Sequence, residues 1–163
     1  MTTVLPTPDL ANTRGSAAPC PELVGQDRAL QVGIVGRSEH DGRVYEMPCL
    51  RFIGPPAGHD PIRLGLFAGV HGDEPAGCIA LRELAAKLAG DPARAAGHEL
   101  FLYPAVNPAG LAAGTRENAN GKDLNREFWR GSDEPEVRAI EAGLRRHRFD
   151  GIIALHADDT CEG

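Results

Sequence analysis

Three side chains of this sequence could together hold a divalent metal ion. His71 closes an apolar run and Glu74 follows it within one tight turn, so both can reach the same ion. His156 lies much later in the chain, at the end of another apolar run. Imidazole nitrogens and carboxylate oxygens are good zinc donors, and a catalytic zinc site combines three protein ligands with a fourth position open to water. These three residues therefore form a candidate zinc site.

A plain structural role is the alternative for the same residues. His71 could merely end a strand, and Glu74 could merely cap a helix, because a His-x-x-Glu spacing by itself is a weak signal. Position along the chain favours the metal interpretation. His71, Asn107 and His156 each follow an apolar run that is typical of a buried strand. Ligands bind outside the carboxyl ends of such strands, so these polar ends are expected to converge.

A polar loop, residues 114–126, carries the second candidate set. It contains Arg116 and Arg126 together with several side-chain amides. An arginine can bind a carboxylate through two parallel hydrogen bonds, and a fixed arginine can stabilise a developing oxyanion. A solvated loop is the ordinary interpretation of such a stretch. That interpretation leaves unexplained why two arginines accompany a candidate metal site.

The elements that must position these residues alternate between strand and helix. The apolar runs and turn signals predict strands over residues 30–35, 43–53, 62–70, 100–106 and 149–155, with a turn at 38–42. Helices are predicted from Glu74 and Pro75 to about Gly90, and over residues 134–147 with Val137, Ile140 and Leu144 facing inward. This alternation predicts an α/β fold with a mostly parallel or mixed sheet flanked by helices.

Length and charge limit the partners that the chain can have. Its 163 residues suit one domain, and 17 Lys and Arg against 23 Asp and Glu give a formal net charge of −6. An acidic chain is a poor candidate for binding nucleic acid or an anionic membrane. No apolar run reaches the roughly 20 residues of a membrane span, and the first residues do not resemble a secretory signal. We therefore expect a cytoplasmic protein with no nucleic-acid or membrane partner.

The whole set of motifs resembles the zinc carboxypeptidase superfamily, which includes metallocarboxypeptidases, murein-peptide amidases and the succinylglutamate desuccinylase/aspartoacylase branch. The resemblance covers roughly residues 30–163. Four blocks carry it, in this order: His71-Gly72-Asp73-Glu74, Asn107-Pro108, Arg116 with Asp123-Leu124-Asn125-Arg126, and His156 after an apolar strand.

The resemblance implies a fold, a cofactor and a role for each site residue. His71, Glu74 and His156 resemble the three ligands of Zn²⁺. Arg116 resembles the catalytic arginine that polarises the scissile carbonyl, and Asn125 and Arg126 resemble the pair that binds the free carboxylate of the substrate. The implied substrate is a small peptide or an N-acyl amino acid with a free carboxylate. Its amide bond would be cleaved by water that zinc activates.

The sequence departs from this superfamily after the third ligand, where the general base, a substrate-contacting tyrosine of the peptidase branch and further strands are expected. The general base of these enzymes is a glutamate well downstream of the third ligand, and the sequence printed here ends at Gly163. Asp158, Asp159 and Glu162 lie near His156, but none of them matches the position of that base. We therefore expect residues 26–163 to be the N-terminal portion of a zinc-hydrolase catalytic domain with an incomplete C-terminal part. Residues 1–25, which contain four prolines, are expected to form a flexible leader.

Three interpretations of function remain open. A metallocarboxypeptidase-like hydrolase and an N-acyl amino acid deacylase differ in whether a C-terminal residue or an acyl group is removed. A non-catalytic zinc-binding remnant would bind metal without turnover, and the chain alone is expected to be weakly active or inactive. A plain α/β domain without metal is the fourth, structural possibility.

Overall fold

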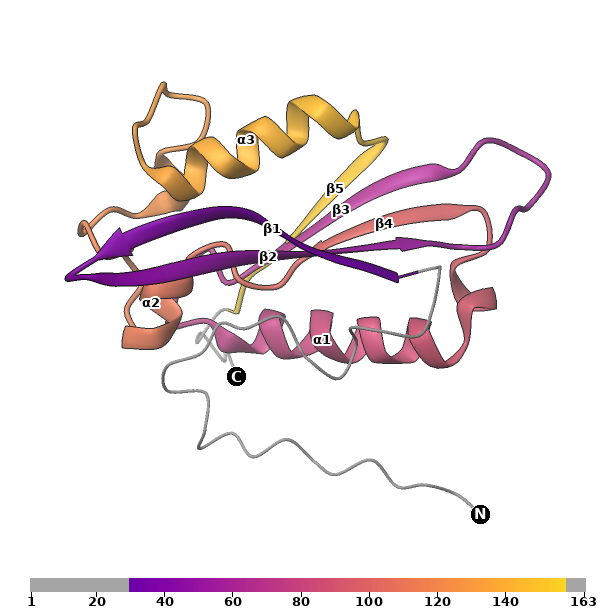
Figure 1. Ribbon diagram of the computed structural model, residues 1–163, viewed down its shortest axis with the longest axis horizontal. Coiled ribbons are helices and arrows are strands. Elements are labelled where there is room, and N and C mark those ends of the chain that lie inside the picture. The colour runs from indigo at the N-terminus through magenta and orange to yellow at the C-terminus, as the bar shows by residue number, and fades with distance from the viewer. Residues whose placement is uncertain (1–29, 158–163) are drawn as a thin grey trace, which may run out of the picture.

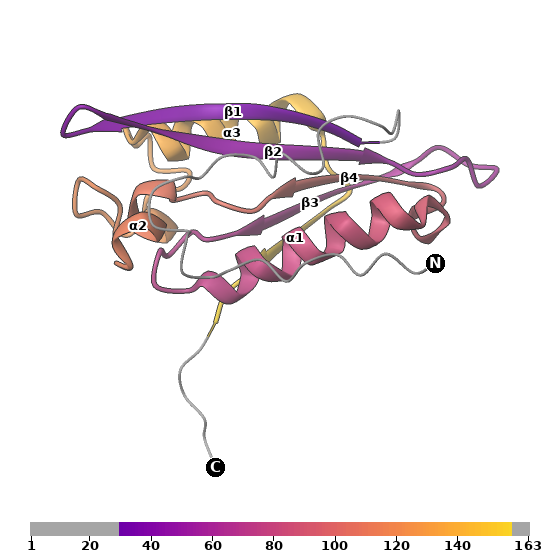
Figure 2. The same cartoon turned by 60° about the horizontal axis from the view of Figure 1, so that its bottom comes forward.

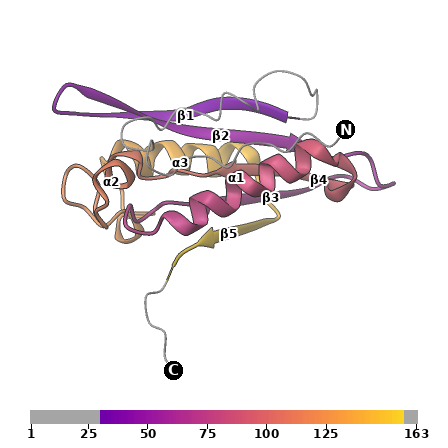
Figure 3. The ribbon, with the colours of Figure 1, turned by 90° about the horizontal axis from the view of Figure 1, so that it is seen from below.

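One mixed sheet of five strands organises the protein. The computed structural model describes residues 30–157, so the expected leader and Asp158, Asp159 and Glu162 lie outside the described residues. The strands lie in the order β1-β2-β4-β3-β5, with β1 at one edge and β5 at the other (Figures 1 and 3). Their bounds are Leu30–His40 (β1), Arg43–Ile53 (β2), Ile62–Ala68 (β3), His98–Tyr103 (β4) and Gly151–Leu155 (β5).

The hairpin of β1 and β2 is longer and its turn is tighter than the sequence predicts. The expected five-residue turn at 38–42 is wrong, because β1 continues to His40 and only Asp41 and Gly42 connect the strands. Both connecting residues have positive φ angles, 49° and 71°. A two-residue hairpin turn of type I′ requires positive φ at both positions, and its backbone twist matches the right-handed twist of the paired strands.

The three other strands run parallel to one another. β3 pairs in parallel with β4 on one side and with β5 on the other, and β4 joins the antiparallel hairpin through β2. Helix α1 (Pro75–Gly90) connects β3 to β4, and helix α3 (Pro135–His147) precedes β5. The two helices cover opposite faces of the sheet (Figures 1 and 2). The predicted α/β fold with a mixed sheet and flanking helices is confirmed.

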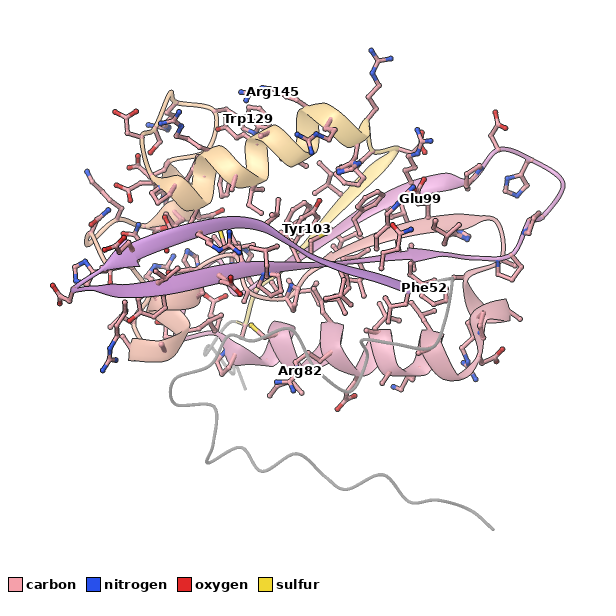
Figure 4. All side chains as sticks on the ribbon, viewed as in Figure 1. Phe52, Arg82, Glu99, Tyr103, Trp129 and Arg145 are labelled. Carbon is pink, nitrogen blue, oxygen red and sulfur yellow. The ribbon has the colours of Figure 1, made fainter. Side chains whose placement is uncertain are left out.

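Strand β4 shows how both faces of the sheet are buried. Leu100 and Leu102 pack with the residues under α1, whereas Phe101 and Tyr103 pack with the residues under α3. Successive side chains of a strand point to opposite faces, so a central strand between two helices must be apolar at every position. Figure 4 shows Phe52 on the α1 side of the sheet and Tyr103 on the α3 side.

Several short elements differ from the sequence prediction. β3 ends at Ala68 and β4 at Tyr103, before the predicted ends at residues 70 and 106. A two-turn helix that was not predicted, α2 (Pro108–Ala113), follows β4, and a 3₁₀ turn spans Leu124–Arg126. Asn107 is the N-cap of α2, and its side chain accepts a hydrogen bond from Gly110 N. Within residues 30–157 no helix has the length and apolarity needed to span a bilayer.

Candidate metal centre and its arginine loop

The turn between β3 and α1 buries His71. The residue is only 2% exposed, and Glu74 N donates a hydrogen bond to His71 O at 3.3 Å, which closes the turn. Gly72 lies against the first turn of α2, where an added Cβ atom would overlap the backbone of Gly110 and Leu111. Only glycine fits this close backbone approach. Packing therefore requires the glycine of the His71-Gly72-Asp73-Glu74 turn.

The Glu74 carboxylate joins the two histidines. Its Oε1 atom lies 2.8 Å from His71 Nδ1, and its Oε2 atom lies 2.9 Å from His156 Nδ1. The backbone N–H of Ala157 also donates to Oε2, at 3.0 Å. Glu74 occupies the N-cap position of α1, but its side chain makes no capping hydrogen bond. A role as a simple helix cap is therefore wrong for this side chain.

The donor set fits a zinc ion. His71, Glu74 and His156 each offer one ligand atom, and these three atoms all lie within 4.8 Å of one another. Two imidazole nitrogens and one carboxylate form a common ligand set of catalytic zinc sites. The His71 Nε2 atom is 3.0 Å from Asp123 Oδ1. A carboxylate that accepts from Nε2–H leaves the Nδ1 lone pair free for a metal and fixes the orientation of the ring.

Asp123 is the site residue that the sequence analysis missed. It contacts His71 through Oδ1 and Arg116 through Oδ2, which lies 3.3 Å from the arginine Nε. Its sequence position beside Leu124-Asn125-Arg126 placed it in a recognised motif but gave it no role of its own. The contact with His71 depends on how the loop folds back over the turn after β3. No local spacing could indicate that contact.

Arg116 reaches the same group of carboxylates from the loop after α2. Its Nη1 atom lies 3.6 Å from Glu74 Oε1, and its side chain is 44% exposed. The guanidinium is therefore held by two acidic residues of the site while part of it stays open to solvent. A fixed cation with free N–H groups can stabilise negative charge on an incoming carbonyl oxygen.

Hydrogen bonds lower the pKa values of both acidic residues. Burial alone would raise the pKa of Glu74, but its hydrogen bonds with Ala157 N, His71 and His156 outweigh burial and lower that pKa below its ordinary value. Burial likewise opposes ionisation of Asp123, yet the hydrogen bond with His71 and the nearby charge of Arg116 lower its pKa. Both carboxylates are thus kept ionised, which is the form that binds a cation.

Asn125 and Arg126 lie next to this group and do not join it through their side chains. Both residues are exposed on the 3₁₀ turn that Asp123 begins. Asn125 N donates to Asp123 Oδ1 at 3.0 Å, and Arg126 N donates to Asp123 O at 2.9 Å. In the part of the chain that the structure describes, neither side chain bonds to His71, Glu74 or His156.

Of the three polar residues that were expected to converge after strands, two do so. His71 and His156 have ring centroids 4.9 Å apart. Asn107 is fully buried and caps α2 instead, while its Nδ2 atom lies 3.5 Å from Arg116 O. It supports the start of the arginine loop rather than His71, Glu74 or His156.

The chain is similar to several known proteins. The chain matches the family described as the succinylglutamate desuccinylase/aspartoacylase catalytic domain over residues 61–153. Carboxypeptidase SOL1 of Arabidopsis thaliana is 32% identical over 143 residues, covering 76% of this chain and 26% of that protein. Murein peptide amidase A of Escherichia coli (strain K12) is 39% identical over 93 residues, covering 56% of this chain and 35% of that protein.

A solved structure has a similar fold. A metallo-carboxypeptidase from Burkholderia cenocepacia superimposes with a TM-score of 0.70 at 28% identity, covering 80% of this chain and 37% of that chain. Since the family match spans more than half of the residues, this chain belongs to the succinylglutamate desuccinylase/aspartoacylase catalytic-domain family of the zinc carboxypeptidase-like superfamily. The chain spans 26–37% of the length of these three relatives.

Proposed function

We propose that this chain carries the metal-binding and substrate-binding residues of a zinc-dependent hydrolase of the metallocarboxypeptidase type. It would cleave an amide bond next to a free carboxylate. The convergence of His71, Glu74 and His156, whose ligand atoms lie within 4.8 Å of one another, carries the proposal. The carboxypeptidase and amidase relatives support it, as does the fold shared with a metallo-carboxypeptidase.

His71 Nδ1, a Glu74 oxygen and His156 Nδ1 would hold the ion, because these are the atoms that face one another. Zinc bound there would lower the pKa of a water molecule toward ~7 and polarise the carbonyl group of the substrate. Asp123 would keep His71 oriented through its Nε2 atom, 3.0 Å away. The contacts among these groups form without a substrate, which supports a preorganised site.

The two arginines would bind different groups of the substrate. Arg116, held between Asp123 and Glu74, would face the carbonyl oxygen on which negative charge develops. Exposed Arg126, with Asn125 beside it, would bind the free carboxylate through two parallel hydrogen bonds. Because the 3₁₀ turn starts at Asp123, the carboxylate anchor and the oxyanion donor are fixed relative to the same residue.

A second candidate activity is N-acyl amino acid deacylation. The family match over residues 61–153 favours it, because the description of that family names two deacylases, succinylglutamate desuccinylase and aspartoacylase. The two activities use the same metal ligands and the same carboxylate anchor. They differ in the acyl side of the amide bond, which is a peptide for a carboxypeptidase and a small acyl group for a deacylase. The substrate therefore distinguishes them, and the metal site does not.

Paired substrates provide the test. The zinc-loaded chain would be incubated with an N-blocked dipeptide that has a free C-terminus, and separately with N-succinyl and N-acetyl amino acids. Release of the free amino acid would be followed by mass spectrometry, with the C-terminally amidated dipeptide as control. Cleavage of the free dipeptide alone supports the carboxypeptidase type, and cleavage of the acyl amino acids alone supports the deacylase. Zinc binding without cleavage of either would count against both activities for this chain by itself and favour the zinc-binding remnant.

A further inference from the structure

The loop that carries Arg116 and Asp123 contains one buried polar side chain, Asn118. Asn118 is only 6% exposed, although Arg116, Glu117 and Asn120 around it are exposed. A buried amide must find hydrogen-bond partners for both its oxygen and its nitrogen, or its burial is costly. The partners of Asn118 therefore show what it does.

One half of Asn118 closes the loop on itself. Its Oδ1 atom accepts hydrogen bonds from Asn120 N and Lys122 N, both at 3.0 Å. Its own N–H donates to Lys122 O at 2.9 Å, and its carbonyl accepts from Gly121 N at 3.0 Å. Residues 118–122 thus form a closed turn. The chain leaves this turn beside the point where it entered.

This closure brings the two functional side chains of the loop together. Arg116 lies two residues before the closed turn and Asp123 lies one residue after it, and their side chains meet at 3.3 Å. The same Asp123 carboxylate contacts His71. The geometry of the closed turn therefore sets where both Arg116 and Asp123 stand relative to the metal ligands.

The other half of Asn118 fastens the closed turn to α3. Its Nδ2 atom donates to Glu134 Oε2 at 2.6 Å and lies 3.4 Å from Glu136 Oε2. Glu136 is 1% exposed in the first turn of α3, and Glu134 is the N-cap residue of that helix. α3 packs on the sheet, so these two carboxylates give the loop a rigid point of attachment.

We propose that Asn118 is a positioning residue that locks the Arg116–Asp123 loop to the start of α3 and thereby holds Asp123 against the metal ligand His71. The catalytic meaning of this lock rests on the proposed function. The lock itself concerns contacts within the chain and can be measured without any substrate.

An amide is required at this position because its two ends face opposite kinds of partner. Asn118→Asp keeps the shape and keeps an oxygen for the two backbone N–H groups. It replaces the donor that faces Glu134 and Glu136 with a third acceptor, and adds a negative charge beside two carboxylates. The substitution should therefore release the loop from α3 and leave the closed turn intact.

The chain offers a matched control and a rescue. Asn120→Asp makes the same change two residues away, at an exposed side chain whose Nδ2 atom donates to the same Glu134 Oε2 at 2.9 Å. Combining Asn118→Asp with Glu134→Gln exchanges donor and acceptor across the contact, so a hydrogen bond can form again. A merely structural effect of the added charge would be the same in the control and would not be restored by the exchange.

Two measurements test the proposal at a temperature where all variants are folded. In the metal-free protein, exchange of the Asn125 and Arg126 amide hydrogens, which bond to Asp123, should accelerate about tenfold in Asn118→Asp. Zinc affinity should fall by about tenfold, the lower end of the effect of losing an orienting partner. In Asn120→Asp, the amide-exchange rates and the zinc affinity should both stay within about twofold of those of the unmodified chain. The double variant Asn118→Asp with Glu134→Gln should recover most of the zinc affinity and of the amide protection that Asn118→Asp loses.

Unchanged amide exchange and zinc affinity in Asn118→Asp would overturn the proposal, and so would an equal effect of Asn120→Asp. If Asn118→Asp does not fold, the comparison of Glu134→Ala with Asn120→Asp decides. Glu134→Ala removes the contacts of both Asn118 and Asn120 with Glu134, Asn120→Asp removes only the second, and Glu134 makes no capping bond that would be lost. Absence of hydrolysis by the unmodified chain counts against the proposed function alone. Absence of zinc binding leaves amide exchange to decide whether the lock exists.

Discussion

Oε2 of Glu74 and Nδ1 of His156 lie 2.9 Å apart although 82 positions separate them in the chain. The sheet explains the contact. β3 and β5 are parallel neighbours, with Ala68 opposite Leu155. The residues that follow the two strands therefore leave the sheet side by side, at the carboxyl ends of the strands. α1 begins directly after Glu74 and packs closely on β5, since a Cβ atom added at Gly77 would lie 3.0 Å from Leu155 Cβ. Glu74 and His156, two of the proposed metal ligands, are therefore positioned by strand pairing and helix packing rather than by a local motif.

Zinc should stabilise the chain through these ligands. A zinc concentration one hundred times the dissociation constant adds about 2.7 kcal/mol to the free energy of unfolding. That corresponds to a rise in melting temperature of about 5–10 °C for a domain of this size. His71→Ala or His156→Ala should abolish the rise, whereas His59→Ala, at an exposed histidine, should keep it. Melting curves with and without zinc check this, and an equal rise in all variants would contradict the assigned ligands.

The two arginines should affect different kinetic constants of an active, zinc-loaded enzyme. Arg116→Ala should lower kcat by about 10²–10³-fold, because it removes a donor that acts mainly in the transition state. Arg126→Ala should mainly raise KM for substrates with a free carboxylate, because it removes their anchor. Lys122→Ala removes an exposed cation from the same loop and serves as the control. Kinetics that are unchanged in either arginine variant would refute the role assigned to that arginine.

Gly72 should be irreplaceable where the turn after β3 meets α2. Gly72→Ala places a Cβ atom against the backbone of Gly110, which cannot move aside as a side chain can. We expect a loss of about 1–3 kcal/mol of stability and weaker zinc binding, since His71 precedes this contact directly. Gly90→Ala, with no atom within 4 Å of the added Cβ, is the control. Chemical denaturation and zinc titration of both variants would show whether the close contact matters.

The sequence predicted the parts of this structure that local patterns encode. The apolar runs gave β2 its bounds of residues 43–53, and the 3.6-residue period gave α3, with Val137 and Ile140 buried as expected. The positions of His71 and His156 after strands were also readable, because the ends of parallel strands gather at one edge. Strand ends were less predictable. The residues after Ala68 and Tyr103 remain apolar and buried without continuing the sheet.

The contacts of the arginine loop could not be predicted from the sequence. Asp123 and Asn118 look like ordinary loop residues, and their importance comes from contacts with His71 and with the first turn of α3. Those contacts join segments whose separation follows no helical or strand period. Asn107 shows the opposite error, because a polar residue after a strand was expected at the site and instead caps a helix that the sequence analysis did not identify.

Glu99 should make the stability of the chain sensitive to acid. It lies on β4 (Figure 4) and is 4% exposed. Its two oxygens are bound by Arg51 of β2 and Arg63 of β3. Burial alone would raise the pKa of Glu99, but hydrogen bonds from Arg63 and Arg51 lower it below its ordinary value of 4.5. A carboxylate with a lowered pKa stabilises the fold above that ordinary value, and the stabilisation is lost as the pH falls through the lowered pKa.

Glu99→Gln should therefore cost about 2 kcal/mol at pH 7, because it weakens two charge-assisted hydrogen bonds. The difference between the variant and the unmodified chain should shrink as the pH falls below 4.5, where the protonated Glu99 resembles glutamine. Glu46→Gln, which removes the charge of an exposed ion pair with Arg37, should cost less than about 1 kcal/mol at any pH. Urea denaturation of the three proteins between pH 3 and pH 7 measures these differences. A cost of Glu99→Gln that is the same at both ends of this range would show that the ionised carboxylate contributes nothing beyond its shape.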